Sequence, residues 1–177
     1  RLFSLLALFA CMTATYAQEQ CIATLRKSDG TVYVYHGANA FVDAHSNAET
    51  KGSVITLSSG VFYGTTITKN ITLRGAGMDK DTLTNREPTL IVNDFGINET
   101  DSVIIEGIRY DGTFKYGDLD YVERTTSNMT FLKSQIFRIT KYSDRYNKLV
   151  NAFLINCKIT GNLYLSEGSS AVCVNSV

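Results

Sequence analysis

Short hydrophobic runs alternate with polar residues along the middle of the chain, and Ser, Gly or Asn separates one run from the next. Four such runs lie between Gly52 and Gly77: Val54–Leu57, Val61–Tyr63, Thr66–Thr68 and Ile71–Leu73. Alternation of this kind is typical of strands with one buried face. Hairpins prefer longer strands and Asn-Gly-type turns, so these runs favour a chain that turns several corners per coil and stacks coil on coil.

Similar strands recur further along. Three segments align position by position: Ile71-Thr-Leu-Arg-Gly75, Val103-Ile-Ile-Glu-Gly107 and Phe153-Leu-Ile-Asn-Cys157. A fourth segment matches them more weakly, Phe131-Leu-Lys-Ser-Gln135. Their first residues lie 32, 28 and 22 positions apart in chain order, a spacing similar to that of solenoid repeats. The pattern predicts that the first and third residue of each segment point inward. Loops should leave the coils at three places: Met78–Pro88, Asp111–Asn128 and Thr140–Lys148.

The region before the first coil is predicted to hold a strand and a helix. The strand covers Thr31–Tyr35, after an Asp-Gly turn. In Gly37–Thr50, the residues Ala40, Phe41, Ala44 and Ala48 recur at helical spacing. A solenoid exposes the apolar end of its first coil, so we expect this helix to cover that end.

The N-terminus has the pattern of a secretory signal peptide. Leu2–Met12 is apolar, and small residues lead to a predicted cleavage before Gln18. The apolar run is shorter than the roughly 20 residues of a membrane span, while lipid attachment at Cys11 is a less favoured alternative. The predicted organisation is therefore a signal peptide over 1–17, an extended segment and first strand over 18–36, and a β-helix over 37–177. The end of the chain has the pattern of another coil, so we expect the protein to continue beyond it.

The segment from Gly52 to Gly77 resembles the N-terminal coil of the pectin-lyase-like superfamily of right-handed parallel β-helices. The resemblance rests on Gly52-Ser-Val-Ile55, on Ser59-Gly-Val-Phe62 and on Ile71-Thr-Leu-Arg-Gly-Ala-Gly77. It implies an all-β solenoid with a short capping helix, secreted or placed at the outer cell surface or in the periplasm. Asp81-Thr-Leu83 and Asp101-Ser-Val103 are similar to sites that Bacteroidetes glycosylate on secreted proteins, which favours a bacterial envelope protein.

The charge content excludes one class of partner, and the cysteine content leaves two arrangements open. The chain has 17 basic and 17 acidic residues without a run of either sign, so it lacks the positive field that nucleic acid binding requires. After cleavage, Cys21, Cys157 and Cys173 would remain. Cys157 and Cys173 are interpreted as small buried residues in strands, and a disulfide between them is the alternative.

Carboxylates are the candidate catalytic groups. The chain has two histidines, too few for most Ser-His-Asp or histidine-based metal sites. Paired acids are the machinery of glycoside hydrolysis. The resemblance implies instead that a carboxylate cluster holds Ca²⁺ in a lyase, with Arg109, Lys115 or Arg124 as base. The candidate catalytic residues are Asp111, Asp118, Asp120, Arg109 and Arg124. The polygalacturonase-like signatures of the superfamily are not found in this sequence.

Tyrosines on the predicted loops are candidates for stacking on sugar rings: Tyr110, Tyr116, Tyr121, Tyr142 and Tyr146. The favoured hypothesis is a non-catalytic, secreted or cell-surface β-helix module for adhesion, carbohydrate contact or scaffolding, without a cofactor or a metal. The alternative is a polysaccharide lyase or glycoside hydrolase acting on acidic polysaccharides. A focused cluster of Asp with Arg or Lys on an outward sheet face favours the enzyme, and scattered acids favour the module.

Overall fold

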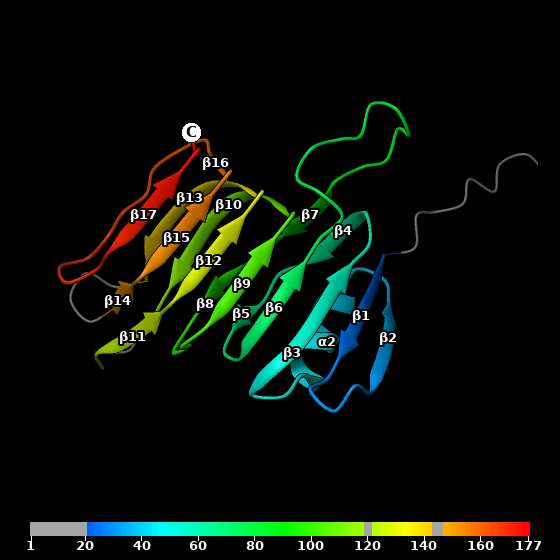
Figure 1. Ribbon diagram of the computed structural model, residues 1–177, viewed down its shortest axis with the longest axis horizontal. Helices are drawn as coiled ribbons and strands as arrows, with labels where there is room; N and C mark the ends of the chain where they lie inside the picture. Colours follow the sequence, from blue (N-terminus) through cyan, green and yellow to red (C-terminus); the bar gives the residue numbers. More distant parts are fainter. Residues whose placement is uncertain (1–20, 119–121, 143–146) are drawn as a thin grey trace, which may run out of the picture.

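The chain folds into a parallel β-helix whose strands stack into long sheets (Figure 1). The computed structural model describes residues 21–118, 122–142 and 147–177. The largest sheet contains, in spatial order, β17 (Ala171–Val174), β15 (Ala152–Ile155), β12 (Met129–Leu132), β9 (Val103–Glu106), β6 (Asn70–Arg74), β3 (Lys51–Leu57), β1 (Ile22–Arg26) and β2 (Val32–His36). From β3 to β17 the neighbouring strands are parallel.

A second sheet runs alongside the first and completes most of each coil. Its order is β16 (Lys158–Ile159), β13 (Gln135–Lys141), β10 (Arg109–Tyr116), β7 (Thr89–Val92) and β4 (Gly60–Tyr63). The second half of β10 turns away to pair with β8 (Gly96–Ile97), which pairs with β5 (Thr66–Ile67), while β11 (Arg124–Ser127) pairs with β14 (Asn147–Val150). The predicted parallel β-helix is confirmed.

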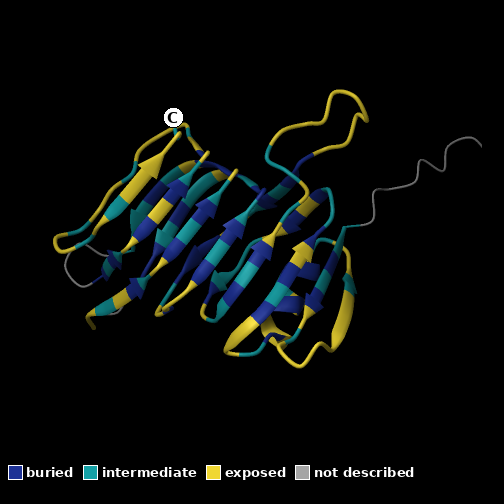
Figure 2. Ribbon diagram, in the orientation of Figure 1, coloured by how far each residue is buried: buried dark blue, intermediate teal, exposed yellow. Residues whose placement is uncertain are grey.

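The coils differ in length because loops of different size leave them. Paired positions along the largest sheet run from Val54 through Thr72, Ile104, Thr130 and Phe153 to Val172, and so lie between 18 and 32 residues apart by subtraction. The longest interval contains the predicted loop 78–88, which protrudes from the body of the molecule (Figure 2). Inside it, Asp81 accepts hydrogen bonds from the backbone N–H groups of Leu83 and Thr84 and from the Thr84 hydroxyl.

An antiparallel hairpin and a helix close the N-terminal end of the solenoid. β1 pairs antiparallel with both β2 and β3, so the segment predicted to be merely extended contains a strand of the sheet. The predicted helix is present as α2 (Ala40–Asn47) and is shorter than the pattern indicated. Its residues Ala40, Phe41 and Ala44 are buried, which fits the expected role of covering the first coil.

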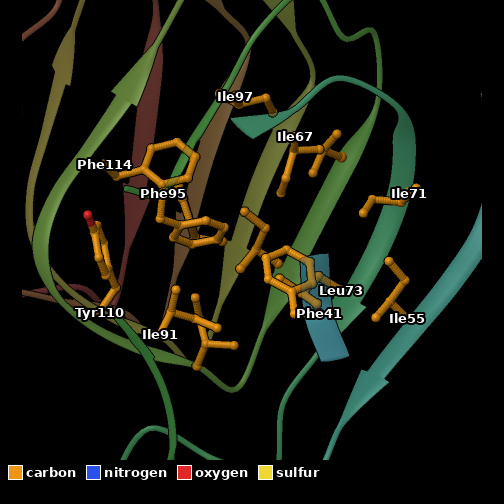
Figure 3. Close-up of a cluster of buried hydrophobic side chains, with 14 of the residues drawn as sticks. Phe41, Ile55, Ile67, Ile71, Leu73, Ile91, Phe95, Ile97, Tyr110 and Phe114 are labelled. Atoms are coloured by element: carbon orange, nitrogen blue, oxygen red, sulfur yellow. The ribbon is translucent and has the colours of Figure 1, made fainter. Parts of the chain in front are cut away.

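Aromatic rings run through the interior from the helix into the later coils. Phe41 contacts Phe95 edge-on at 6.0 Å between ring centroids, and Phe95 contacts Phe114 at 5.0 Å (Figure 3). Phe114 in turn contacts Phe131 at 5.1 Å. Edge-to-face pairs at such distances are favourable in addition to the area they bury. This aromatic column of Phe41, Phe95, Phe114 and Phe131 therefore packs the capping helix α2 against the coils that follow.

The structure corrects the alignment of two repeats. Phe131 pairs with Ile105 and with Leu154, so Met129 and Phe131 are the inward pair of β12, not Phe131 and Lys133. In β15 the inward residues are Ala152 and Leu154, while Phe153 is 38% exposed. A shift of one residue moves a side chain to the opposite face of a strand, so the prediction that Phe153 points inward is wrong.

The prediction of one long loop over Asp111–Asn128 is also wrong. β10 extends to Tyr116, and β11 occupies Arg124–Ser127. The buried residues of β10, Tyr110, Phe114 and Tyr116, keep the alternation of a strand. The prediction missed this strand because Asp111 and Gly112 in its middle are residues typical of turns. Thr140 and Lys141 belong to β13 and Lys148 to β14, so the third predicted loop is shorter than expected.

Candidate functional site

The outward face of the second sheet carries a row of side chains at equivalent positions of successive coils. Strand pairing aligns Val61 of β4 with Leu90 of β7, Leu90 with Arg109 of β10, Arg109 with Gln135 of β13, and Gln135 with Lys158 of β16. Neighbouring strands lie about 4.8 Å apart, so these residues, far apart in sequence, stand beside one another. The row is apolar towards the N-terminal end and polar beyond it.

A groove of about 1540 Å³ lies over the apolar part of this row. The outward residues of β4, β7 and β10 form its floor, and the loop 78–88 supplies a wall. The ends of the β1–β2 hairpin and residues 37–38, which lead into α2, close one end. The lining residues are Cys21, His36, Gly37, Ala38, Gly60, Val61, Tyr63, Lys80, Glu87, Pro88, Leu90, Arg109 and Asp111. A hollow of this size with an apolar floor and a few polar groups is typical of ligand sites.

Tyr63 is the exposed aromatic residue of this groove. Its side chain alternates with Phe62, which is fully buried, and it remains 40% exposed. Val61 on the same strand is exposed as well. An exposed ring beside aliphatic side chains provides a flat apolar surface with a hydroxyl at its rim.

Arg109 and Asp111 form an ion pair at the polar end of the groove. Arg109 Nε lies 3.0 Å from Asp111 Oδ1 and 2.8 Å from Oδ2, and Nη2 lies 2.8 Å from Oδ2. Gln135 Nε2 donates to Asp111 Oδ1 at 3.0 Å. Each carboxylate oxygen therefore faces two N–H donors, which nearly fills the acceptor capacity of the group.

This arrangement holds Asp111 in its ionised form. The Arg109 guanidinium lowers the pKa of Asp111 by hydrogen bonding and by charge, against a smaller opposing effect of burial, and Gln135 and the Lys158 charge add to the lowering. The pKa of Arg109 is raised, chiefly by its hydrogen bond to Asp111. A carboxylate fixed in this way is a poor proton donor and offers little room for a proton from a substrate. Its evident role is to fix Arg109.

The wall of the groove carries a second ion pair. Lys80 Nζ lies 2.5 Å from Glu87 Oε1, and the two residues stand on opposite arms of the loop 78–88. Both side chains are about half exposed. The pair joins the two arms next to Pro88, where the chain returns to β7.

The remaining candidate acids and bases are scattered over other parts of the coil. Asp118 Oδ2 accepts from Asn98 Nδ2 at 3.2 Å, and Arg124 is ion-paired with Glu99. Neither residue lines the groove. Asp120 lies outside the described residues. The structure therefore brings Arg109 and Asp111 together and does not place Asp118 or Arg124 with them.

Of the three candidate tyrosines within the described residues, two lie on a strand. Tyr110 and Tyr116 lie on β10 and are buried, so their predicted placement on a loop is wrong. Tyr110 Oη donates to the Asn93 carbonyl at 2.8 Å, and Tyr116 Oη donates to the Tyr164 carbonyl at 3.2 Å. Burial raises the pKa of Tyr110. These rings contribute to the core and present no exposed face to a sugar.

Tyr142 is half-buried and outside the groove. The ammonium of Lys115, a candidate base, lies 4.8 Å from the centre of its ring. Burial raises the pKa of Tyr142. Tyr121 and Tyr146 lie outside the described residues. Of the five candidate tyrosines, the structure thus leaves Tyr142 as the one described ring with some exposure.

The groove also contains residues that the sequence pattern did not indicate as site residues: Tyr63, Leu90 and the pair Lys80–Glu87. Tyr63 could have been found, because the run Val61–Tyr63 predicts a strand whose first and third residues share a face. That Leu90 lies beside Val61 depends on the length of the coil between them, for which no local pattern gives a signal.

The structure answers part of the question about cysteines and metals. Within the described part of the chain, Cys157 is buried as interpreted, and no disulfide joins it to Cys173. Cys173 lies on β17 but is exposed, so the interpretation of Cys173 as a buried residue is wrong. Cys21 Sγ donates to the Val61 carbonyl at the edge of the groove. Among the residues that the structure describes, no group of three or more His, Cys, Asp or Glu side chains is arranged to hold a metal ion.

Fold and groove define this protein as a parallel β-solenoid with a ligand-sized groove on one sheet. Comparison with models of known families, with curated proteins and with solved structures finds no match to the chain. Over the described ranges, no helix has both the length and the apolar character needed to cross a membrane.

Proposed function

We propose that this chain is a non-catalytic β-helix module, secreted or displayed at the cell surface, that binds a glycan in the groove over β4, β7 and β10. The observation that carries the proposal is the exposed ring of Tyr63 on an apolar floor, facing the same groove as the fixed guanidinium of Arg109. Aromatic rings stack on the apolar faces of sugars, and guanidinium N–H groups donate to hydroxyl oxygens.

The solenoid supports recognition of an extended ligand. The groove crosses three parallel strands about 4.8 Å apart and continues to the β1–β2 hairpin. Its floor therefore runs along the axis of the coils, as a chain molecule requires. The apolar leader over 1–17 supports export, and the likeness of Gly52–Gly77 to pectin-lyase-like proteins supports a polysaccharide-related role.

The lyase or hydrolase alternative finds less support. It requires a groove residue that exchanges a proton with the substrate. Asp111 is ionised and occupied by Arg109 and Gln135, and Glu87 is paired with Lys80. The other candidate acids in the described ranges lie outside the groove. Of the candidate acids that the structure describes, Asp111 alone lines the groove, so the aspartates form no cluster there.

The test is binding of the chain to a panel of plant, algal and animal glycans by calorimetry, with Tyr63→Ala as the groove variant. Tyr33→Ala is the matched control, because Tyr33 is an exposed tyrosine on β2 outside the groove. We expect Tyr63→Ala to weaken binding about tenfold or more, in the range that loss of a stacking ring produces, and Tyr33→Ala to leave it unchanged. Release of unsaturated uronates or reducing ends from the panel would instead establish an enzyme.

A further inference from the structure

We infer that the groove selects uncharged glycans and discriminates against polyuronates. This inference rests on the proposed glycan-binding function and specifies the ligand class. The groove is lined by four charged residues, Lys80, Glu87, Arg109 and Asp111. Two are positive and two negative, so their formal charges cancel.

The charges cancel in pairs as well as in sum. Lys80 is 2.5 Å from Glu87, and Arg109 is 2.8 Å from Asp111. Opposite charges at such distances leave little net field a few ångströms away, and salt screens the remainder over about 8–10 Å. A polyuronate, with a carboxylate on every sugar, would gain little attraction here. It would also bring its charge near the carboxylates of Glu87 and Asp111.

The same pairs suit hydroxyl groups. The guanidinium of Arg109 has five N–H groups. The single N–H on Nε and one N–H on Nη2 face Asp111, and among the described contacts the other three N–H groups are available to the groove. Because Asp111 fixes the guanidinium, a neutral hydroxyl oxygen meets an oriented donor without having to displace a counterion.

The rest of the floor is an uncharged, mainly apolar surface. Val61, Leu90 and Pro88 are apolar, and Tyr63 adds its ring. Lys158 belongs to the same outward row but stands on β16, two strands beyond Arg109, and does not line the groove. The positive charge on the floor is therefore that of Arg109, which the carboxylate of Asp111 compensates.

Two matched pairs of polymers test the inference. Polygalacturonate and its fully methyl-esterified form share a backbone and differ in charge, as do carboxymethylcellulose and hydroxyethylcellulose. For at least one pair, we expect the neutral member to bind about tenfold more tightly, equivalent to about 1.4 kcal/mol. Raising the salt concentration should change that affinity by less than about twofold, because no net charge is paired on binding.

Two variants remove one negative charge each. Asp111→Asn leaves Arg109 uncompensated, and Glu87→Gln leaves Lys80 uncompensated on the exposed wall, where folding should be unaffected. Each should raise affinity for the charged polymers several-fold and make it dependent on salt, following the screened Coulomb attraction. Circular dichroism of each variant checks that it is folded.

The outcomes separate the two proposals. Tighter, salt-dependent binding of the charged polymers by the unaltered chain would overturn the inference and leave glycan binding intact. Failure of both variants to gain affinity for charged polymers would overturn the charge-compensation argument. A folded chain that binds neither member of either pair, nor any glycan of the wider panel, would overturn the proposed function together with the inference.

Discussion

The two faces of the sheet made by β4, β7 and β10 come from alternate residues of the same strands and have opposite properties. The inner face buries Phe62, Ile91 and Tyr110, and the Tyr110 ring contacts Phe95 edge-on (Figure 3). The outer face presents Tyr63, Leu90 and Arg109 to the groove. The inner face therefore carries the stability of the coil, and the outer face is available for recognition. Changes to single residues on each face should separate these roles.

The largest effect is expected from Phe62→Ala. The ring is fully buried, and loss of a buried phenylalanine costs about 3–5 kcal/mol through lost burial and the cavity it leaves. Urea unfolding followed by circular dichroism measures the loss. A cost below about 1 kcal/mol would contradict the view that the inner face of β4 is a packed core.

The next largest effect on stability is expected from His45, which is buried on the capping helix α2. His45 Nε2 accepts a hydrogen bond from the Thr68 backbone N–H at 3.3 Å. Burial, with the nearby Lys69 charge, lowers the pKa of His45 from 6.5 to about 4. The folded chain therefore keeps the imidazole neutral, while the unfolded chain takes up a proton below about pH 6.5. The stability that neutral His45 contributes is complete above that pH and is lost as the pH falls towards 4.

The expected loss between pH 7 and pH 4 is about 3 kcal/mol, from about 1.4 kcal/mol per pKa unit. Unfolding free energies at several pH values between 7 and 4 measure it. His45→Gln is the control, because the amide oxygen can accept the same hydrogen bond and does not titrate. An equal pH dependence in both proteins would assign the effect to other groups.

A smaller effect is expected from Tyr110→Phe. The substitution keeps the buried ring and removes the hydroxyl that donates to the Asn93 carbonyl. Loss of one such hydrogen bond costs about 1 kcal/mol, and Asn93 is exposed enough for water to replace the donor. Unfolding in urea gives the value. Weakened glycan binding with unchanged stability would contradict the placement of Tyr110 on the inner face.

The smallest effect on stability is expected from Tyr63→Ala, one residue from Phe62. Its side chain is substantially exposed, and exposed substitutions away from special features change stability by about 0.5 kcal/mol or less. The same substitution should have the larger effect on binding. A stability loss close to that of Phe62→Ala would show that Tyr63 belongs to the core and would remove the principal contact of the proposed site.

Sequence patterns predict much of the architecture because they depend on local alternation. Ile71 and Leu73, like Val103 and Ile105, are buried as predicted. Val61–Tyr63 and Ile71–Leu73 lie within strands, and the helix lies where its apolar spacing indicated. The candidate site was predicted less well. Arg109 and Asp111 do meet, but Asp118 and Arg124 lie elsewhere, and two tyrosines expected on a loop are in the core.

The sequence by itself determined the parallel coils, the capping helix and the protruding loop, because each depends on residues close together in the chain. Tertiary structure alone decided which residues become neighbours between coils. The number of residues per coil varies, so pairing of Val61 with Leu90 and of Leu90 with Arg109 is set by stacking of the whole solenoid. A shift of one residue would exchange the faces, replacing the groove with core residues, and only the packed interior fixes that choice.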